Sequence, residues 1–208
     1  MQRITAIEPQ KRKGRYNVFL DEEFAFGADK ETIFHFGLRK NDELSDEKIN
    51  EIRDYDEFNL GKKTAFSFLG YKPRTEKELI KKLKEKKISV KNIEKTLKVL
   101  KDLKYLDDGQ YAKMYLEEKL SRKPAGKRLI SMKLAEKGIK KEVIENVMAS
   151  QYSEEKEKKK AKELLIKYLK KVRAKSDLDK KQKCYRFLLS RGFDYEIVKS
   201  VCSIESTD

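Results

Sequence analysis

The feature that most constrains the fold of this chain is an internal repeat in its apolar residues. When Leu83, Leu134 and Leu188 are aligned, the spacings between the copies are 51 and 54 residues. Because self-similarity at a fixed period marks repeated structural units, the sequence predicts three tandem copies of one unit. The same two spacings align four further sets of apolar residues: Leu79, Ile130 and Cys184; Ile88, Ile139 and Phe193; Ile93, Ile144 and Val198; and Leu97, Met148 and Cys202.

The spacing of apolar residues inside each copy predicts helices. Leu79 and Leu83 are one helical turn apart, as are Ile93 and Leu97, so each pair forms an apolar stripe on one helix face. A further helical pattern precedes the two stripes in every copy, so we expect units of three helices. Its residues are Ala65, Phe66, Phe68 and Leu69 in the first copy, Tyr111, Ala112, Tyr115 and Leu116 in the second, and Leu164, Leu165, Tyr168 and Leu169 in the third.

Turn and capping residues agree with these helices. Gly138 and Gly192 stand between the two stripes, where a left-handed residue ends a helix at little cost. The first copy has Lys87 at this place, so its turn should be less favourable or differently shaped. Thr75 and Glu78 have the spacing of a capping box, which marks the start of the first stripe helix.

Residues 1–60 predict a different kind of structure. Residues 4–7 and 16–20 are short runs of β-type composition, and a turn at 21–23 leads into the similar run 24–26. Short runs of this kind bounded by turn residues predict a small hairpin or meander with one apolar face.

Two helix starts follow the predicted strands. Asp29 can cap a short helix that Gly37 would end. Ser45 precedes two acidic residues that are favourable in a first helical turn. We expect the second of these helices to continue into the basic part of the chain.

Together these patterns predict an all-α fold. It consists of three tandem three-helix repeats that form an elongated, curved array, with a small N-terminal β-hairpin or meander plus helix as an extension. Only 38% of the residues are apolar and 42% are charged, which favours thin helical layers over one deep core. The predicted domains are the β-containing extension at 1–60, repeat one at 61–107, repeat two at 108–151 and repeat three at 152–208.

The net charge of +15 is unevenly distributed. Residues 1–60 sum to −4, whereas the remainder sums to +19. A cationic body of this kind favours nucleic acid or an acidic protein surface as the partner, without choosing between them. The basic cluster at 11–15 lies at the predicted hairpin tip. Basic side chains in such turns are more often solvated than in contact with phosphate.

Several classes of site are excluded by composition. Cys184 and Cys202 are 18 residues apart and His35 is the one histidine, so no zinc-ligand pattern exists. Both cysteines occupy apolar positions and are expected to be buried and reduced. No run approaches the length of a membrane-spanning helix, and the N-terminus has no signal-peptide core. We expect a cytosolic, non-enzymatic protein with no catalytic, metal or cofactor site.

Four stretches of the chain, taken in order, carry a recognisable pattern. They are Ala65-Phe66-Ser67-Phe68-Leu69; Arg74-Thr75-Glu76-Lys77-Glu78-Leu79; Leu106-Asp107-Asp108 with Tyr111-Ala112; and Gly126, Ile130 and Leu134-Ala135-Glu136-Lys137-Gly138-Ile139. In this order and spacing they resemble the RecX family. The resemblance is strong over 65–148, whereas the third copy matches only as a repeat and 1–60 is similar to the N-terminal extension of longer members.

The resemblance implies a regulator of the RecA recombinase. Such a protein would bind RecA–single-stranded DNA filaments, with the DNA as an accessory contact, and would lodge in the filament groove. There it would curb ATP hydrolysis and strand exchange. We expect a monomer. A general basic helical nucleic-acid-binding protein without recombinase specificity is the alternative, and an all-helical enzyme is a distant third because phosphate-loop, metal and nucleophile motifs are missing.

The most recognisable residues are interpreted as scaffold. Asp107 has the position of an N-cap, a role that contributes about 1 kcal/mol of helix stability and requires no metal or catalysis. Gly126 and Gly138 are most simply turn and cap glycines. The full set of structural signature residues is Leu106, Asp107, Asp108, Tyr111, Ala112, Gly126, Leu134, Gly138 and Ile139.

Partner binding is assigned instead to the basic faces of the helices, although such charge is often only a solvated face. Tyr71, Tyr105 and Tyr111 have the chemistry to stack on bases, but packing in the core or between repeats is favoured for them. The candidate binding residues are Arg74, Lys81, Lys82, Lys84, Lys127, Arg128, Lys133, Lys156, Lys158, Lys159, Lys160, Lys162, Lys167, Lys170, Lys171 and Arg173.

Overall fold

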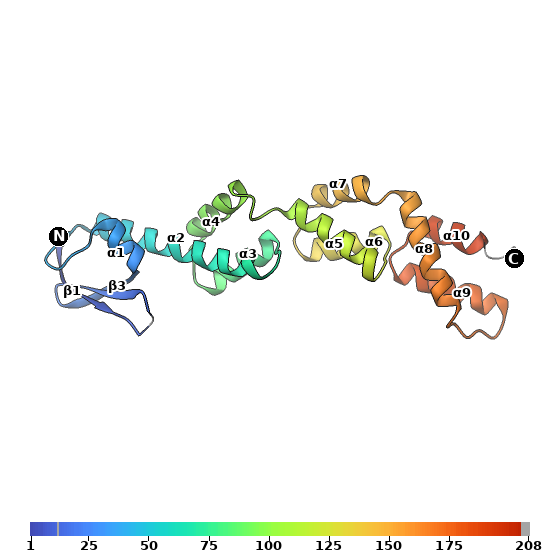
Figure 1. Cartoon of the computed structure of the whole chain (residues 1–208), viewed down its shortest axis with the longest axis horizontal. Coiled ribbons are helices and arrows are strands. Elements are labelled where there is room, and N and C mark those ends of the chain that lie inside the picture. The colour runs from blue at the N-terminus through green and yellow to red at the C-terminus, as the bar shows by residue number, and fades with distance from the viewer. Residues whose placement is uncertain (12, 205–208) are drawn as a thin grey trace. The chain divides into compact units, whose positions relative to one another are not determined.

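The computed structural model describes residues 1–11 and 13–204, which form a small sheet followed by helices (Figure 1). By packing, the chain divides into two compact units, residues 1–72 with 79–105 and residues 73–78 with 106–208. The elements in chain order are β1 (Gln2–Pro9), β2 (Arg15–Leu20), β3 (Glu23–Asp29), α1 (Lys30–Phe36), β4 (Glu43–Leu44), α2 (Asp46–Tyr71), α3 (Glu76–Glu85), α4 (Val90–Asp102), α5 (Asp108–Arg122), α6 (Lys127–Glu136), α7 (Lys141–Gln151), α8 (Glu154–Leu169), α9 (Asp177–Ser190) and α10 (Tyr195–Ile204).

The predicted meander is confirmed, with one strand added. The antiparallel sheet has the order β3-β2-β1-β4. Its apolar face packs on α1 and the start of α2, where Ile4, Val18 and Ile52 are completely buried. The strand that sequence did not predict is β4, which pairs Leu44 with Gln2. Two residues are too few to show the alternation that identifies a strand.

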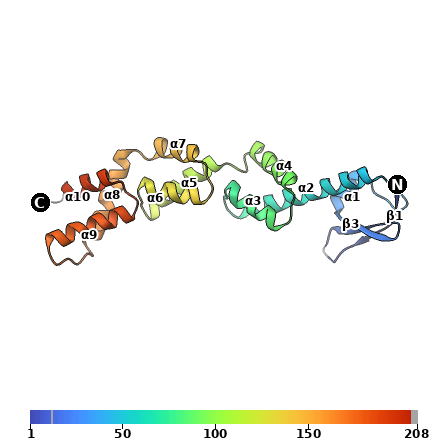
Figure 2. The same ribbon diagram turned by 180° about the vertical axis from the view of Figure 1, so that it is seen from behind.

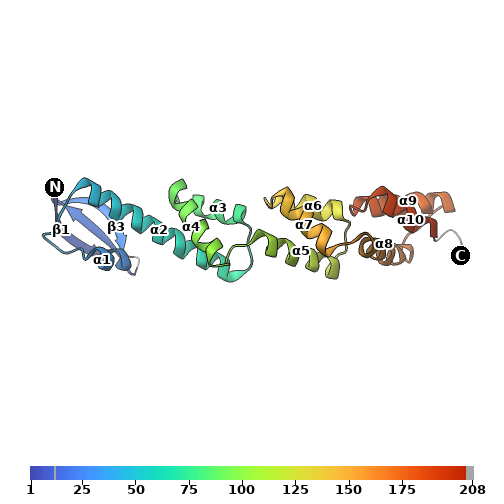
Figure 3. The same cartoon turned by 90° about the horizontal axis from the view of Figure 1, so that it is seen from above.

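Both predicted helix starts are confirmed. The Asp29 carboxylate accepts a hydrogen bond from the Glu31 N–H at 3.1 Å, and Gly37 ends α1 in the left-handed conformation with φ 62°. The Ser45 hydroxyl accepts one from the Lys48 N–H at 3.2 Å. From there α2 runs from the sheet to α4 and into the basic part of the chain (Figure 3).

The three predicted groups of three helices are present. Figure 2 shows α5 to α7 as one cluster and α8 to α10 as another. The first of the three groups is built on the packing of α2 against α4. Every one of the fifteen aligned apolar positions is buried, and Leu83, Leu134 and Leu188 are buried completely. The repeat in the sequence is therefore a repeat of buried stripes.

The turns between the stripes share one conformation. Gly138 and Gly192 have φ values of 86° and 81°, and Lys87 has φ 60°. The turn of the first copy is thus not differently shaped. It has the same left-handed residue, at the steric cost of about 1–2 kcal/mol that a side chain carries there.

The burial of Leu134 leads to a stability prediction. Replacing Leu134 by Ala should lower the free energy of unfolding by about 2–5 kcal/mol, because it removes apolar contacts and leaves a cavity. Chemical denaturation would measure the loss. Met132→Ala is the matched control, since the Met132 side chain lies on the same helix and is 48% exposed. Equal stabilities of the two variants would contradict the inward position of Leu134.

Candidate partner-binding surface

The signature residues lie in the scaffold. Leu106, Leu134 and Ile139 are buried. The Asp107 carboxylate caps α5 by accepting a hydrogen bond from the Gln110 N–H at 2.9 Å. The neighbouring Asp108 accepts one from the Glu76 N–H at 3.0 Å. Both carboxylates therefore bind backbone donors at helix starts, which is a structural role.

A hydrogen-bonded junction occurs twice in the second unit. The Thr75 hydroxyl donates to the Lys137 carbonyl at 2.8 Å, and the Gly126 N–H donates to the Arg191 carbonyl at 3.0 Å. Thr75 and Gly126 are 51 residues apart and the two acceptors 54, so the junctions join equivalent positions of the repeat. A Cβ at Gly126 would lie 2.2 Å from the Gly192 carbonyl oxygen, so a side chain there is excluded.

Glu157 belongs to the interior. Its side chain is buried and accepts a hydrogen bond at 2.7 Å from the Lys127 N–H, at the start of α6. The Lys127 ammonium lies 3.8 Å from the same carboxylate. Burial raises the pKa of Glu157 above its usual value, against the lowering effect of the Lys127 N–H and ammonium.

The predicted binding surface did not take account of the burial of Glu157. A signal for its burial exists in the sequence, because Glu157 precedes the buried Ala161 and Leu165 at intervals of four residues. A charged residue in register with an apolar stripe faces the same side of the helix.

The predicted basic residues fall into two groups. Five of the sixteen make ion pairs within the chain: Lys82, Lys127, Lys133, Lys158 and Lys160. Lys156 donates to the Gln151 carbonyl, and Arg74 is half-buried. The other nine are exposed and make no ion pair with another described residue: Lys81, Lys84, Arg128, Lys159, Lys162, Lys167, Lys170, Lys171 and Arg173.

The exposed unpaired cations are concentrated in one stretch. Six of the nine lie in α8 or within four residues of its end. An exposed ammonium without an internal partner keeps its hydration and its charge available for a phosphate or a carboxylate. Residues 159–173 therefore hold most of the candidate cations that make no ion pair with another described residue.

Two of the three tyrosines lie on the surface. The Tyr71 side chain is 84% exposed, so its interpretation as a packing residue was wrong. Tyr105 is 61% exposed and keeps one edge contact with Phe66, at 5.3 Å between ring centroids. Tyr111 is half-buried and stacks on Tyr115.

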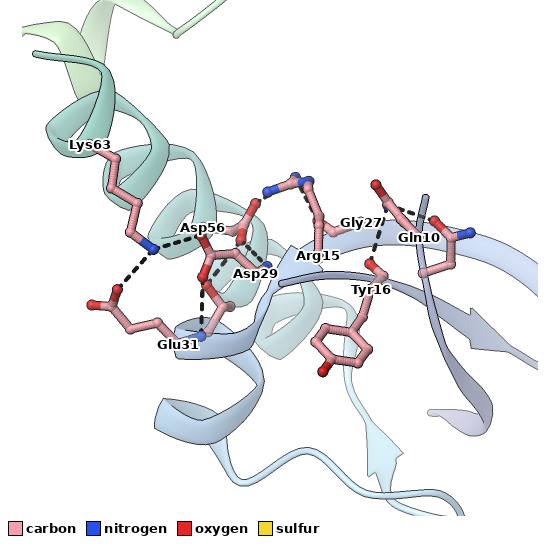
Figure 4. Close-up of polar contacts among 10 residues, drawn as sticks. Gln10, Arg15, Tyr16, Gly27, Asp29, Glu31, Asp56 and Lys63 are labelled. Atoms are coloured by element: carbon pink, nitrogen blue, oxygen red, sulfur yellow. Dashed lines mark hydrogen bonds and ion pairs between the residues drawn. The ribbon is translucent and has the colours of Figure 1, made fainter. Parts of the chain in front are cut away.

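A polar network that sequence did not predict lies between the sheet, α1 and α2 (Figure 4). The buried Asp56 carboxylate accepts hydrogen bonds from the Arg15 guanidinium at 2.8 Å, the Asp29 N–H at 2.7 Å and the Thr32 hydroxyl at 3.0 Å. Asp56 follows the buried Ile52 by one helical turn, so it shares the register of the apolar stripe, but the sequence does not show which donors meet its carboxylate.

Lys63 extends the network to the surface. Its ammonium lies 2.7 Å from the Asp29 carboxylate and 3.0 Å from that of Glu31 (Figure 4). Burial acts to raise the pKa of Asp29, but the bonds from Lys63 and the Glu31 N–H outweigh it and hold this pKa below its usual value. The same contact with Asp29 raises the pKa of Lys63.

Within residues 1–11 and 13–204 no group of three or more His, Cys, Asp and Glu side chains is placed to hold a metal ion. No helix in this part of the chain has the length and apolar character needed to cross a membrane. Cys184 and Cys202 are buried and form no disulfide.

Four family models match the chain in consecutive order. The "Regulatory protein RecX N-terminal domain" matches residues 2–45. The first, second and third three-helix domains of RecX match 62–100, 107–148 and 152–202. The matches follow the sheet and the three helical groups described above.

Individual proteins resemble the chain over most of its length. A regulatory protein RecX from Leuconostoc mesenteroides is 35% identical, covering 97% of this chain and 75% of that one. Another, from Clostridium botulinum, is 37% identical and covers 97% and 95%. A crystal structure of regulatory protein RecX matches with a TM-score of 0.75 at 30% identity, over 97% of this chain and 98% of that one. RecX from Lactobacillus salivarius matches with a TM-score of 0.66 at 27% identity, over 72% and 96%.

The contacts of Glu157 generate a prediction. Glu157→Ala should lower the free energy of unfolding by about 1–3 kcal/mol, because it leaves the partly buried Lys127 N–H without an acceptor. Glu157→Gln should lose less, since its amide oxygen can accept the same bond. Thermal or chemical denaturation measures both. Glu155→Ala, an exposed neighbour on α8, is the control, and a loss equal to that of Glu157→Ala would refute the role of the buried carboxylate.

Proposed function

The chain belongs to the RecX family of regulatory proteins, which are not enzymes, and on this basis we propose that it binds RecA–single-stranded DNA filaments. It modulates them, mainly by inhibiting the RecA ATPase and recombinase activity. The observation that carries the proposal is the match to all four parts of the family architecture, in order, together with relatives that are similar over the whole chain. The site of action is the cytoplasm, and the protein acts as a monomer without a cofactor.

The basic helical faces are the proposed contact surface. A RecA–DNA filament presents phosphates and protein carboxylates, and both attract exposed cations. The nine exposed lysines and arginines without internal ion pairs are best suited to this contact, above all those of 159–173. Through them the protein lodges in the filament groove, with single-stranded DNA as an accessory contact. The boundaries 1–60, 61–107, 108–151 and 152–208 remain the proposed domain division.

The first test is the DNA-dependent ATPase rate of preformed RecA–single-stranded DNA filaments with substoichiometric protein. We expect the rate to fall while RecA stays on the DNA, because the protein acts through the filament. Excess unlabelled single-stranded DNA added as a competitor should not abolish the effect. An unchanged ATPase rate over a wide range of protein concentration would remove the regulator proposal.

The alternative, a general nucleic-acid-binding protein, makes a different prediction. Such a protein binds bare DNA tightly, and its affinity falls steeply with salt because each phosphate contact releases a counterion. The regulator should bind bare DNA weakly and filaments tightly. Titrations of both at several salt concentrations separate the two, and tight binding to bare DNA without any filament preference would favour the alternative.

Charge reversal tests the proposed surface. The variant Lys162→Glu with Lys167→Glu and Lys170→Glu should weaken filament binding, measured by co-sedimentation, and leave the helical circular dichroism unchanged. These side chains are exposed and make no ion pair with a described residue, so the fold does not depend on them.

The matched control reverses three exposed lysines outside the proposed set, Lys98, Lys113 and Lys199. It changes the net charge by the same amount. Equal weakening in both triple variants would show a general charge effect and would remove 159–173 as the specific surface.

A further inference from the structure

The first unit contains a groove that neither the family models nor the sequence predictions assign to a function. Its volume is about 850 Å³. Lys13, Gly14 and Arg15 at the start of β2, the start of α1, the second half of α2 and the end of α3 form its walls. All of these residues belong to the same compact unit, so the groove does not depend on the arrangement of the two units.

The groove is cationic after its internal ion pairs are counted. Six of its lining residues are Lys or Arg and two are acidic. Both acids, Asp29 and Glu31, are paired with Lys63. Two more of the cations are paired with acids outside the lining, one of them Arg15 with Asp56. The remaining cations, Lys13, Lys30 and Lys86, are exposed and make no ion pair with another described residue.

Two solvated aromatic rings lie on the same groove. Phe34 of α1 is 87% exposed, and Tyr71 at the end of α2 is 84% exposed. An isolated exposed aromatic is ordinary on a protein surface. Here, however, two rings from different helices line one groove together with three uncompensated ammonium groups. Neither ring is needed for the core of this unit.

The hairpin, α1 and α2, which form three walls of the groove, are tied to one another before any ligand binds. The Lys30 N–H donates to the Gly14 carbonyl at 2.9 Å, which ties the hairpin tip to the start of α1. Arg15 links the tip to α2 through Asp56, and Lys63 links α2 to the cap of α1 (Figure 4). A preformed groove loses less entropy on binding than one that must be ordered.

We propose that this groove binds a short segment of single-stranded nucleic acid. Lys13, Lys30 and Lys86 contact its phosphates, and Phe34 and Tyr71 stack on its bases. Proteins that bind single strands without sequence preference combine the same two elements, a cationic groove and aromatic stacking platforms. A duplex cannot use the rings, because its bases are already stacked and paired.

The inference rests on the proposed function in one respect, that the strand is the single-stranded DNA of the filament. It assigns the accessory DNA contact to the first unit and leaves the basic faces of the repeats to the filament protein. The site itself is testable without the recombinase.

The experiment measures the fluorescence anisotropy of a labelled oligo(dT) strand titrated with the full chain. Phe34→Ala combined with Tyr71→Ala should weaken binding by about tenfold or more. Phe24→Ala combined with Tyr105→Ala is the matched control, since these rings are exposed on the same unit but do not line the groove. It should bind as the unchanged protein does.

Salt dependence tests the lysines. Lys30→Gln combined with Lys86→Gln should reduce the slope of log affinity against log salt by about 1.4, because each phosphate contact with a single strand contributes about 0.7. All four residues in the two groove variants are exposed, so unfolding transitions should match that of the unchanged protein.

Three outcomes would overturn the inference. One is equal affinity of the groove variant and the aromatic control for oligo(dT). Another is equal binding of a duplex of the same length, with the same dependence on the rings. The third is displacement of oligo(dT) by poly-glutamate as effectively as by unlabelled oligo(dT), which would make the groove a site for acidic peptides.

The ATPase assay separates this inference from the proposed function. If the groove variants lose oligo(dT) binding and the unchanged protein has no effect on the RecA ATPase, the groove site is supported and the regulator proposal is refuted. If the unchanged protein lowers the ATPase rate and the groove variants still bind oligo(dT) as it does, the regulator proposal is supported and the groove site is refuted.

Discussion

The left-handed turn between the two stripe helices of each repeat is the constraint on which the helical architecture depends. It reverses the chain within a few residues and exposes carbonyls that need donors. In the second unit the carbonyls of Lys137 and Arg191 receive them from Thr75 and Gly126, at equivalent positions of the repeat. Each three-helix group is too thin to bury a large core alone. The turn thus joins the two stripe helices of one repeat, and its carbonyl accepts a hydrogen bond from the start of another helix.

Buried carboxylates connect elements that apolar packing alone would leave loosely oriented. Asp56 joins the sheet, α1 and α2, and Glu157 joins α8 to the start of α6. Removing a carboxylate from water is costly, and it is offset here by N–H, hydroxyl and guanidinium donors directed at the same oxygens. These contacts fix orientation, because a hydrogen bond tolerates less displacement than an apolar contact does.

The basic residues of the chain differ in their availability. Lys63, Lys127 and Lys160 are held in ion pairs with acids of the chain itself, so their charge is largely neutralised locally. The stretch 159–173 and the groove of the first unit keep cations that make no ion pair with a described acid. The cations that remain available for a partner are thus concentrated on a few surfaces of this chain, whose net charge is +15. We propose the first of these surfaces, the stretch 159–173, for the filament protein and the second, the groove, for single-stranded DNA.

Periodicity, capping and turn residues were enough to predict the repeat, the three helices of each copy, the meander and both helix starts at Asp29 and Ser45, because these depend on neighbours within one or two turns. They were not enough for Asp56, Glu157 or Tyr71. The burial of an acid and the exposure of an aromatic ring depend on which distant segment packs against that position. Sequence by itself therefore determined the elements and their buried stripes. Only the tertiary structure decided which charges are neutralised and which remain for a partner, because electrostatic pairing is set by distances between residues far apart in the chain.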